Sequence, residues 1–314
     1  MKRLVFLATC GLVWFMLGVA PAVADNGPHV TGAGVVADNC AGCHRVHTAK
    51  ADSLLSQAQP GLCYTCHGSG VTGANTDVQD GLGYPSAART GTAGALRGGG
   101  FSFALINSAA PTGQTNSYSN AAGIVPVLTT GVAVTSTHTV DGASVMAWGN
   151  GAISSTAASG TTVQLRCGSC HDPHGNGNYR ILRSIPQQSG GTSTPITDAT
   201  TKVYTTANYW TVEDTNATAY IANVSAWCTT CHTRYLSSDA GVNSGDAVYT
   251  YRHRSDQTQQ GKATCIQCHV AHGSNASMGT YSNGVTNPDG TTASGDSRLL
   301  RIDNRGTCQM CHNR

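Results

Sequence analysis

Large hydrophobic side chains are scarce in this 314-residue sequence. It has only 4 phenylalanines, 4 tryptophans and 5 methionines, against 38 glycines. Burial of apolar surface is the dominant favourable term in folding, and aromatic side chains contribute a large share of it. A hydrophobic core built from side chains alone would therefore be thin for this length. We expect another apolar component to fill the interior.

The sequence also lacks an excess of charge of either sign. Charged residues make up 11%, with 18 Lys and Arg against 16 Asp and Glu. No strongly basic surface of the kind that binds nucleic acid is expected. Low net charge also does little to oppose self-association.

The first residues have the pattern of an export signal. Two basic residues at positions 2 and 3 precede an apolar run over 4–19, and Ala-Val-Ala follows at 22–24. This predicts a signal peptide over residues 1–24, and the run is too short to favour a transmembrane segment. The alternative is a lipoprotein signal ending at Cys10, although Thr9 and the continuing apolar run disfavour it.

No cysteine remains for disulfide bonds in the mature chain. The 13 cysteines comprise Cys10 and twelve others, and all twelve lie in six Cys-x-x-Cys-His motifs. That motif is the attachment signature of haem c. Structural zinc sites use paired clusters of four ligands and do not need a histidine at this fixed place. The sequence therefore predicts six covalent haems, held by Cys40, Cys43, Cys63, Cys66, Cys167, Cys170, Cys228, Cys231, Cys265, Cys268, Cys308 and Cys311.

Six porphyrins would supply the missing apolar volume, so the haem-free chain should be largely unfolded. We predict a multihaem cytochrome c with little regular secondary structure. Short helices are expected at the haem motifs, with many loops and a few short strands in the insertions.

Each motif also supplies one axial ligand to its own haem iron. Positions i, i+3 and i+4 share one face of a helical turn, so both cysteines and the histidine reach the same porphyrin. The proximal ligands are predicted to be His44, His67, His171, His232, His269 and His312.

Three motifs carry a second histidine three residues after the first, at His47, His174 and His272. The two axial ligands of an iron lie on opposite sides of the porphyrin, roughly 4 Å apart for metal–nitrogen bonds of about 2 Å. Two histidines on one turn cannot straddle the ring. Each of these spare histidines should therefore bind the iron of a different haem.

The motifs form a threefold repeat of two-haem modules. In each module the first motif carries the spare histidine, the second lacks it, and a short apolar signal such as Leu54-Leu55 lies between them. We place module 1 at 25–68, module 2 at 138–233 and module 3 at 234–314. Residues 69–137 form a Gly/Ser/Thr-rich insertion, and shorter polar insertions cover 186–227 and 273–297. Gly98–Gly100 is predicted to be a flexible turn, and residues 287–290 a plain turn rather than a calcium site.

One further histidine precedes each module, at His29, His138 and His253. The mature chain then has twelve histidines for the twelve axial positions of six irons. Within a module, we predict that the spare histidine serves the second haem, which pairs His47 with His67, His174 with His232, and His272 with His312.

The module pattern resembles the doubled-CXXCH family of multihaem cytochromes c. With six motifs and an upstream histidine, the chain also resembles outer-surface cytochromes of metal-respiring bacteria, of the filament-forming OmcS type. The resemblance implies bis-histidine haems in a continuous row, stacked within modules and meeting edge to edge between them. It also implies a low-potential protein of anaerobic respiration that passes electrons to other cytochromes or extracellular acceptors.

The upstream histidines allow two pairings. In the local pairing, each binds the first haem of its own module. In the shifted pairing, which we favour, His138 binds the His44 haem and His253 the His171 haem, while His29 binds the His269 haem of a neighbouring molecule. Chain termini extend freely, and an open head-to-tail contact forms a filament.

We therefore predict an exported, extracellular hexahaem electron conduit without enzymatic activity that assembles with copies of itself. One alternative is a monomeric periplasmic shuttle with the same ligation. The other is a multihaem reductase of a small oxyanion, which requires an iron with an open axial position.

Overall fold

The computed structural model describes residues 29, 37–107, 127–150, 161–196, 218–235, 243–244, 265–276 and 298–301. The predicted signal peptide, His253 and the sixth motif, with Cys308, Cys311 and His312, lie outside the described residues. So do the predicted turn at 287–290 and most of the insertion at 273–297.

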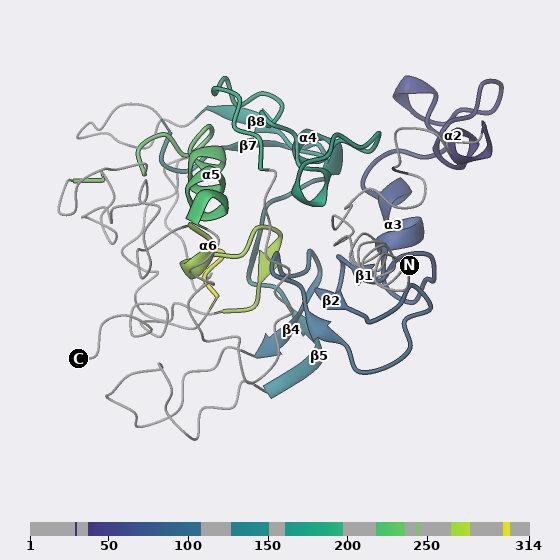
Figure 1. The fold of residues 1–314 in the computed structure, drawn as a ribbon, viewed down its shortest axis with the longest axis horizontal. Helices are drawn as coiled ribbons and strands as arrows, with labels where there is room; N and C mark the ends of the chain where they lie inside the picture. The colour runs from purple at the N-terminus through teal and green to yellow at the C-terminus, as the bar shows by residue number, and fades with distance from the viewer. Residues whose placement is uncertain are drawn as a thin grey trace, which may run out of the picture.

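The helices are short, and each of the five described haem motifs lies in a helix or at its end (Figure 1). The α-helices are α2 (Ala37–Cys43), α3 (Gly61–His67), α4 (Cys167–Cys170), α5 (Thr218–Cys228) and α6 (Cys265–Cys268). Two 3₁₀ turns, η2 (Asp52–Leu54) and η3 (Tyr179–Ile181), follow the first motifs of modules 1 and 2. In Figure 1, α2 stands at the edge of the molecule, beyond α3 and α4.

The strands form small antiparallel sheets, most of them within the predicted insertion at 69–137. The strands are β1 (Thr76–Asp77), β2 (Leu82–Gly83), β3 (Gly94–Ala95), β4 (Phe103–Asn107), β5 (Val127–Ala133), β6 (Ser136–Thr137), β7 (Ser144–Met146), β8 (Thr162–Gln164) and β9 (Gly273–Ser274). They pair as β1-β2-β3, β4-β5, β6-β9 and β7-β8. Because β9 directly follows His272, its pairing with β6 joins the end of the insertion to module 3.

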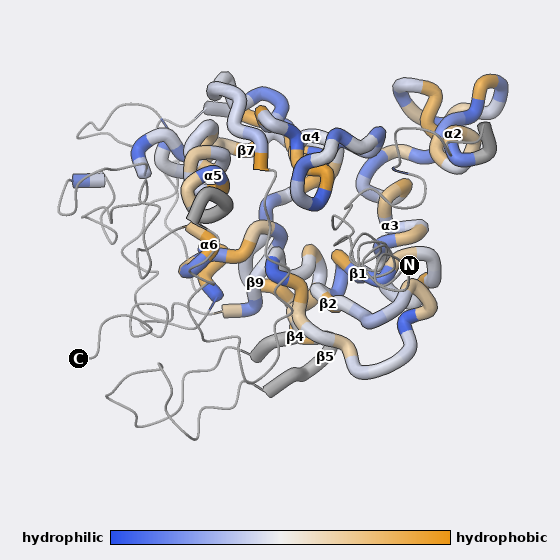
Figure 2. Tube along the Cα trace, in the orientation of Figure 1, coloured by the Kyte–Doolittle hydropathy of each residue, from blue (hydrophilic) through white to orange (hydrophobic). Residues whose placement is uncertain are grey.

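The apolar core is thin, as the composition predicts. The buried hydrophobic residues of the described chain are mainly alanines and valines, and the main buried cluster centres on Ile196 and Val224. Tyr179, Trp227 and Ile266 pack against these two residues. Hydrophobic residues occur in short stretches scattered along the chain (Figure 2). The predicted fold, with short helices at the haem motifs, many loops and a few short strands, is confirmed.

Candidate haem-binding sites

The haem motifs have the local geometry that attachment requires. The amide of His44 donates to the carbonyl of Cys40 at 2.8 Å, and that of His171 to Cys167 at 3.0 Å. The same bond closes the turns ending at His232 and His269. One helical turn therefore brings both cysteines and the histidine to one face. The ten motif cysteines in the described chain are free thiols, available for thioether bonds.

The apolar signal after each first motif folds back onto that motif. Its backbone has positive φ angles in all three modules, at Ser53-Leu54, Arg180-Ile181 and Arg298-Leu299. The next leucine, at 55, 182 or 300, then forms a β-bridge with the proximal histidine. This reversal aims a carbonyl at the histidine ring. The Nδ1 atoms of His44, His171 and His269 each lie 2.9 Å from the carbonyl oxygens of Ser53, Arg180 and Arg298, respectively.

The other histidines are oriented in the same way. His232 donates from Nδ1 to the carbonyl of Trp148, His29 to Pro173, His138 to Ala271 and His272 to Gly99. His67 instead contacts the hydroxyl of Thr76. A carbonyl can only accept, so it fixes the proton on Nδ1 and leaves the Nε2 lone pair free for a metal. This is the usual second shell of a metal-binding histidine.

Burial keeps these rings neutral, as iron ligation requires. Burial, together with the neighbouring His29, lowers the pKa of His67 to about 4. Burial and the neighbouring His138 lower the pKa of His232 to about 4, and burial with His171 lowers that of His272 to about 3. Burial also lowers the pKa values of His138, His171 and His269.

The histidine rings occur in four pairs at a common separation. The ring centroids are 6.1 Å apart for His29 and His67, 6.2 Å for His44 and His174, 6.1 Å for His138 and His232, and 6.3 Å for His171 and His272. Two imidazoles on one iron, with metal–nitrogen bonds of about 2 Å, have centroids about 6 Å apart. The interplanar angles range from 9° to 62°, which rotation about the nitrogen–iron–nitrogen axis allows. The residues therefore fit bis-histidine haems.

These pairs correct the predicted roles of the spare histidines. His174 lies beside His44 rather than His232, and His272 lies beside His171 rather than His312. Both positions agree with the steric argument that a spare histidine serves a haem other than its own. In both cases the neighbouring histidine belongs to the first motif of the preceding module.

The predicted roles of two upstream histidines, His29 and His138, are also wrong. His138 lies beside His232, which belongs to the second haem of its own module, and not beside His44 or His171. His29 lies beside His67 of the same chain and donates to the carbonyl of Pro173. It is therefore placed within its own molecule and not in a neighbour. His253, whose predicted partner was His171, is outside the described residues.

Two histidines have no ring partner within the described chain. His47 is exposed, so its predicted pairing with His67 is also wrong, since His29 takes that place. His269 has its Nδ1 contact to Arg298 but no histidine opposite it in the described residues.

Consecutive modules meet at their cysteines. The neighbouring thiol of Cys167, in the first motif of module 2, raises the pKa of Cys63, in the second motif of module 1. Cys265 raises the pKa of Cys228 in the same way between modules 2 and 3. Each of these cysteines would anchor one porphyrin edge, so haems of adjoining modules would approach each other at these edges.

The sequence did not reveal the residues of the insertion that hold the histidine rings in place. Gly98–Gly100, predicted to be a flexible turn, is a cradle for His272. A Cβ at Gly98 would lie 3.0 Å from Nδ1 of that ring, and the carbonyl of Gly98 accepts its amide at 2.6 Å. Phe101 stacks on the same ring with centroids 4.5 Å apart. A run of three glycines indicates that another part of the chain approaches this backbone closely, but it does not indicate which part.

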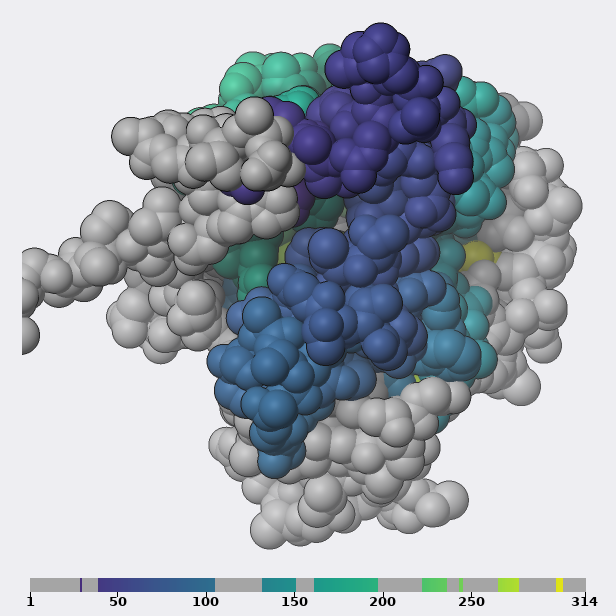
Figure 3. Space-filling model, turned by 90° about the vertical axis from the view of Figure 1, so that its right-hand side faces the viewer, coloured from purple at the N-terminus to yellow at the C-terminus, as the bar shows by residue number. Residues whose placement is uncertain are grey.

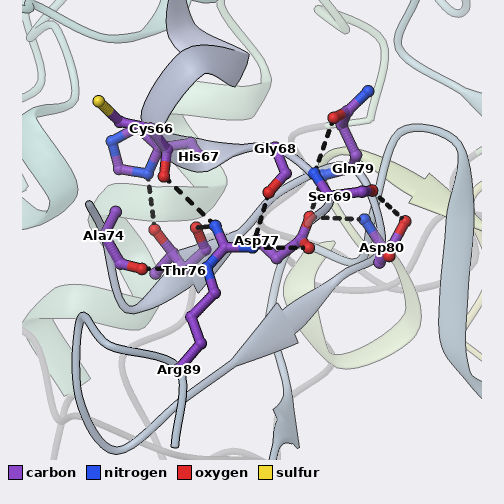
Figure 4. A network of polar contacts seen from close by, with 10 residues as sticks. All are labelled: Cys66, His67, Gly68, Ser69, Ala74, Thr76, Asp77, Gln79, Asp80 and Arg89. Carbon is purple, nitrogen blue, oxygen red and sulfur yellow. Dashed lines mark hydrogen bonds and ion pairs between the residues drawn. The ribbon is translucent and has the colours of Figure 1, made fainter. Parts of the chain in front are cut away.

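A buried ion pair supports His67 in a similar way (Figure 4). Arg89 contacts Asp77 at 3.0 Å and donates to the carbonyls of Cys66, Gly68, Ala74 and Thr76. These bonds join α3 to β1, and they place the Thr76 hydroxyl 2.8 Å from Nδ1 of His67.

Comparison with known families agrees with this geometry. Residues 33–72 match the doubled CXXCH motif, and residues 128–277 match the N-terminal region of the NapC/NirT cytochrome c family. The chain is thus a multihaem c-type cytochrome, a class of electron-transfer proteins.

A more particular similarity is to the tetraheme c-type cytochrome CymA of Shewanella oneidensis. The two are 30% identical over 115 residues, which are 36% of this chain and 60% of CymA. The chain therefore matches less than two thirds of that relative. No solved structure matches the chain. None of these matches names an OmcS-type cytochrome, so they do not support the resemblance to that group. No helix in the described segments is long and apolar enough to span a membrane.

Proposed function

We propose that this chain is an exported hexahaem cytochrome that conducts electrons along a row of bis-histidine haems and extends the row by head-to-tail assembly. The observation that carries the proposal is the offset between modules. His174 of module 2 faces the first haem site of module 1, and His272 of module 3 faces that of module 2.

The described residues bring neighbouring haem sites together both within modules and between them. Within a module, the two motifs lie near each other: burial and the neighbouring Cys63 and Cys66 raise the pKa of Cys43, and burial and the neighbouring Cys231 raise that of Cys170. Between modules, the paired cysteines Cys63–Cys167 and Cys228–Cys265 bring porphyrin edges together. With both axial positions filled, the irons would exchange electrons without binding a substrate, and we therefore propose no enzymatic activity. The haems themselves supply the redox chemistry, and the chain holds their order and spacing.

The same offset leaves the two ends of the row incomplete. By the repeat, the first haem of module 3, at His269, requires a spare histidine from a following module. Module 1 has such a histidine, His47, and no haem motif precedes that module within residues 1–314. We propose that His47 of a second molecule completes the iron of His269. The upstream His253 would then pair with His312, as His29 does with His67 and His138 with His232.

The surface of module 1 supports this assembly. In modules 2 and 3 the residue before the spare histidine, Pro173 or Ala271, accepts a hydrogen bond from the upstream histidine of the preceding module. The equivalent residue in module 1, Val46, is 74% exposed, and Leu54 beside it is 51% exposed. This part of the chain lies on the outer surface at the top of Figure 3. An apolar docking face allows a heterologous contact, which gives an open filament when its rotation does not close a ring.

Substitution of His47 tests the proposal. His47→Ala should leave six haems attached, abolish polymers and yield a monomer with one high-spin haem. His29→Ala is the matched control: it should also make one haem high-spin, that of His67, but leave polymers intact. Microscopy and size-exclusion chromatography report assembly, and electron paramagnetic resonance reports spin state.

The result also separates the alternatives. Polymers that persist in His47→Ala with all irons low-spin would refute the trans ligation. A wild-type protein that stays monomeric with six low-spin haems would be the periplasmic shuttle, with His47 and His253 completing the irons of His269 and His312 within one chain. A wild-type iron that binds carbon monoxide when reduced would indicate the reductase.

A further inference from the structure

His67 and His232 occupy equivalent positions in modules 1 and 2, and the histidines opposite them are also equivalent. Each is the proximal histidine of the second haem in its module, and each ring lies 6.1 Å from that of an upstream histidine, His29 or His138. Those two upstream histidines donate to backbone carbonyls at 2.7 and 2.6 Å. The hydrogen-bond acceptors on the distal side therefore do not distinguish the two haem sites.

The proximal sides differ in the acceptor that faces Nδ1. For His232 it is the carbonyl of Trp148, at 2.5 Å, and for His67 it is the hydroxyl of Thr76, at 2.8 Å. In the described part of the chain, the seven other Nδ1 hydrogen bonds of histidines all go to carbonyls. With Nε2 bound to iron, Nδ1 carries the proton and donates a hydrogen bond that the Thr76 hydroxyl must accept.

The strength of this acceptor bears on the redox potential of the iron. A strong acceptor draws the Nδ1 proton away and makes the imidazole a better electron donor, which stabilises ferric iron and lowers the potential. A hydroxyl is a weaker acceptor than an amide carbonyl. The haem of His67 should therefore be easier to reduce than the haem of His232.

Arg89 strengthens the difference. Its guanidinium donates to the carbonyls of Cys66 and Thr76 at 3.3 and 3.2 Å, so the Thr76 carbonyl is occupied and the hydroxyl is left to face His67 (Figure 4). Its side chain is only 8% exposed, so water screens its positive charge poorly. A nearby positive charge favours the reduced iron, which has one positive charge less. Asp77 offsets part of this effect, but both bonded carbonyls lie next to the haem motif.

We propose that Thr76 is a positioning residue: as a weaker acceptor than a carbonyl, it sets the potential of the haem held by Cys63, Cys66 and His67 above that of its counterpart at His232. The proposal rests on haem attachment at these motifs and not on assembly into filaments. Unequal steps along the row would make this haem a site where electrons reside.

Two substitutions with opposite expected effects test the proposal on the haem-loaded protein. Thr76→Val keeps the shape and removes the acceptor, so the potential of one haem should rise. Thr76→Asn supplies an amide oxygen, so the same potential should fall, and Thr76→Ser should restore the wild-type value. Thr90→Val makes the same chemical change at an exposed residue near Arg89 whose hydroxyl contacts only Ser86, and should change no potential.

The haem is identified by repeating the titrations in a His29→Met background. A histidine–methionine haem differs in its spectrum and potential from bis-histidine haems, so its potential can be followed separately. Opposite shifts of that haem in Thr76→Val and Thr76→Asn support the proposal. Shifts in the same direction, no shift, or a shift confined to another haem would overturn it, whether or not the protein polymerises.

Discussion

Modules 1 and 2 have the same turn after their first haem motif but present it to different surroundings. In module 2, Pro173 accepts a hydrogen bond from His29, and His174 lies opposite His44. In module 1, Val46 is 74% exposed and His47 is exposed. Both turns follow a helical motif and precede a reversal with positive φ, so the local folds match.

The difference lies in position along the row and not in local sequence. Each repeat of a linear array contacts only its neighbours, and terminal repeats of a soluble array need a cap. Within the described residues, nothing caps the turn of module 1. An uncapped repeat can continue with another copy, and the experiments below test how far the two modules are equivalent.

Omitting the haems should have the largest effect, because both modules depend on them. The described chain buries few large side chains, with Ile196 and Val224 at its main cluster. Burial of so little apolar area does not offset the entropy of ordering the chain. Chain produced without haem attachment should show no cooperative unfolding in circular dichroism and rapid proteolysis of both modules. A sharp thermal transition in that material would contradict this.

A charge on the exposed turn should block assembly without loss of any haem. Val46→Glu places a carboxylate where the repeat requires an apolar contact, and a buried unpaired charge costs several kcal/mol. Sedimentation should show monomers at concentrations where the wild type polymerises. Ile185→Glu is the control, since Ile185 is also exposed, at 40%, but lies in module 2 away from this turn. Equal loss of polymers in both variants would indicate general destabilisation.

The sequence predicted the class of protein because covalent attachment imposes a fixed spacing. Two cysteines and a histidine must share one helical turn, and this requirement is visible in the chain itself. The number of histidines likewise predicted bis-histidine ligation. The pairing could not be predicted, because it depends on how modules dock. The spare His174 and His272 lie beside histidines of the preceding module, and no local pattern records that direction.

The groups that orient the histidine rings could not be predicted from the sequence for a second reason. The proximal rings are oriented mostly by backbone carbonyls, such as that of Trp148, and a carbonyl is present at every residue. Its use depends on a turn with positive φ or on a strand from the insertion. The apolar signal at Leu54-Leu55 was recognised, but its role in aiming the Ser53 carbonyl at His44 required the structure.

A side chain added within the glycine turn Gly98–Gly100 should displace His272 from its position beside His171 in part of the molecules. A Cβ at Gly99 would lie 2.1 Å from the carbonyl oxygen of Gly273, and Gly99 supplies the acceptor for His272. Gly99→Ala should therefore displace the loop and convert a fraction of the His171 haem to high spin. Gly70→Ala is the matched control, because its φ of +68° resembles the +70° of Gly99 but nothing lies within 4 Å. The two share a strain of about 1–2 kcal/mol, so any difference reports the contact. Unchanged spin state in Gly99→Ala would show that His272 is held by other means.

The junctions between modules should differ in strength. At the junction of modules 2 and 3, Val224 is 6% exposed and packs in the cluster that includes Ile266. Val224→Ala removes two methyl groups, at about 0.8 kcal/mol each, and leaves a cavity that adds to the loss.

At the junction of modules 1 and 2, the corresponding residue is Gln59, four positions before its motif. Its side-chain oxygen accepts from the amide of Gly168 at 2.8 Å. Gln59→Ala removes this bond, which is worth about 1 kcal/mol, while its backbone carbonyl still accepts from Arg166. Denaturant unfolding of the haem-loaded protein should show the smallest loss of free energy here. A larger loss than in Val224→Ala would mean that the polar junction, and not the apolar one, holds the row together.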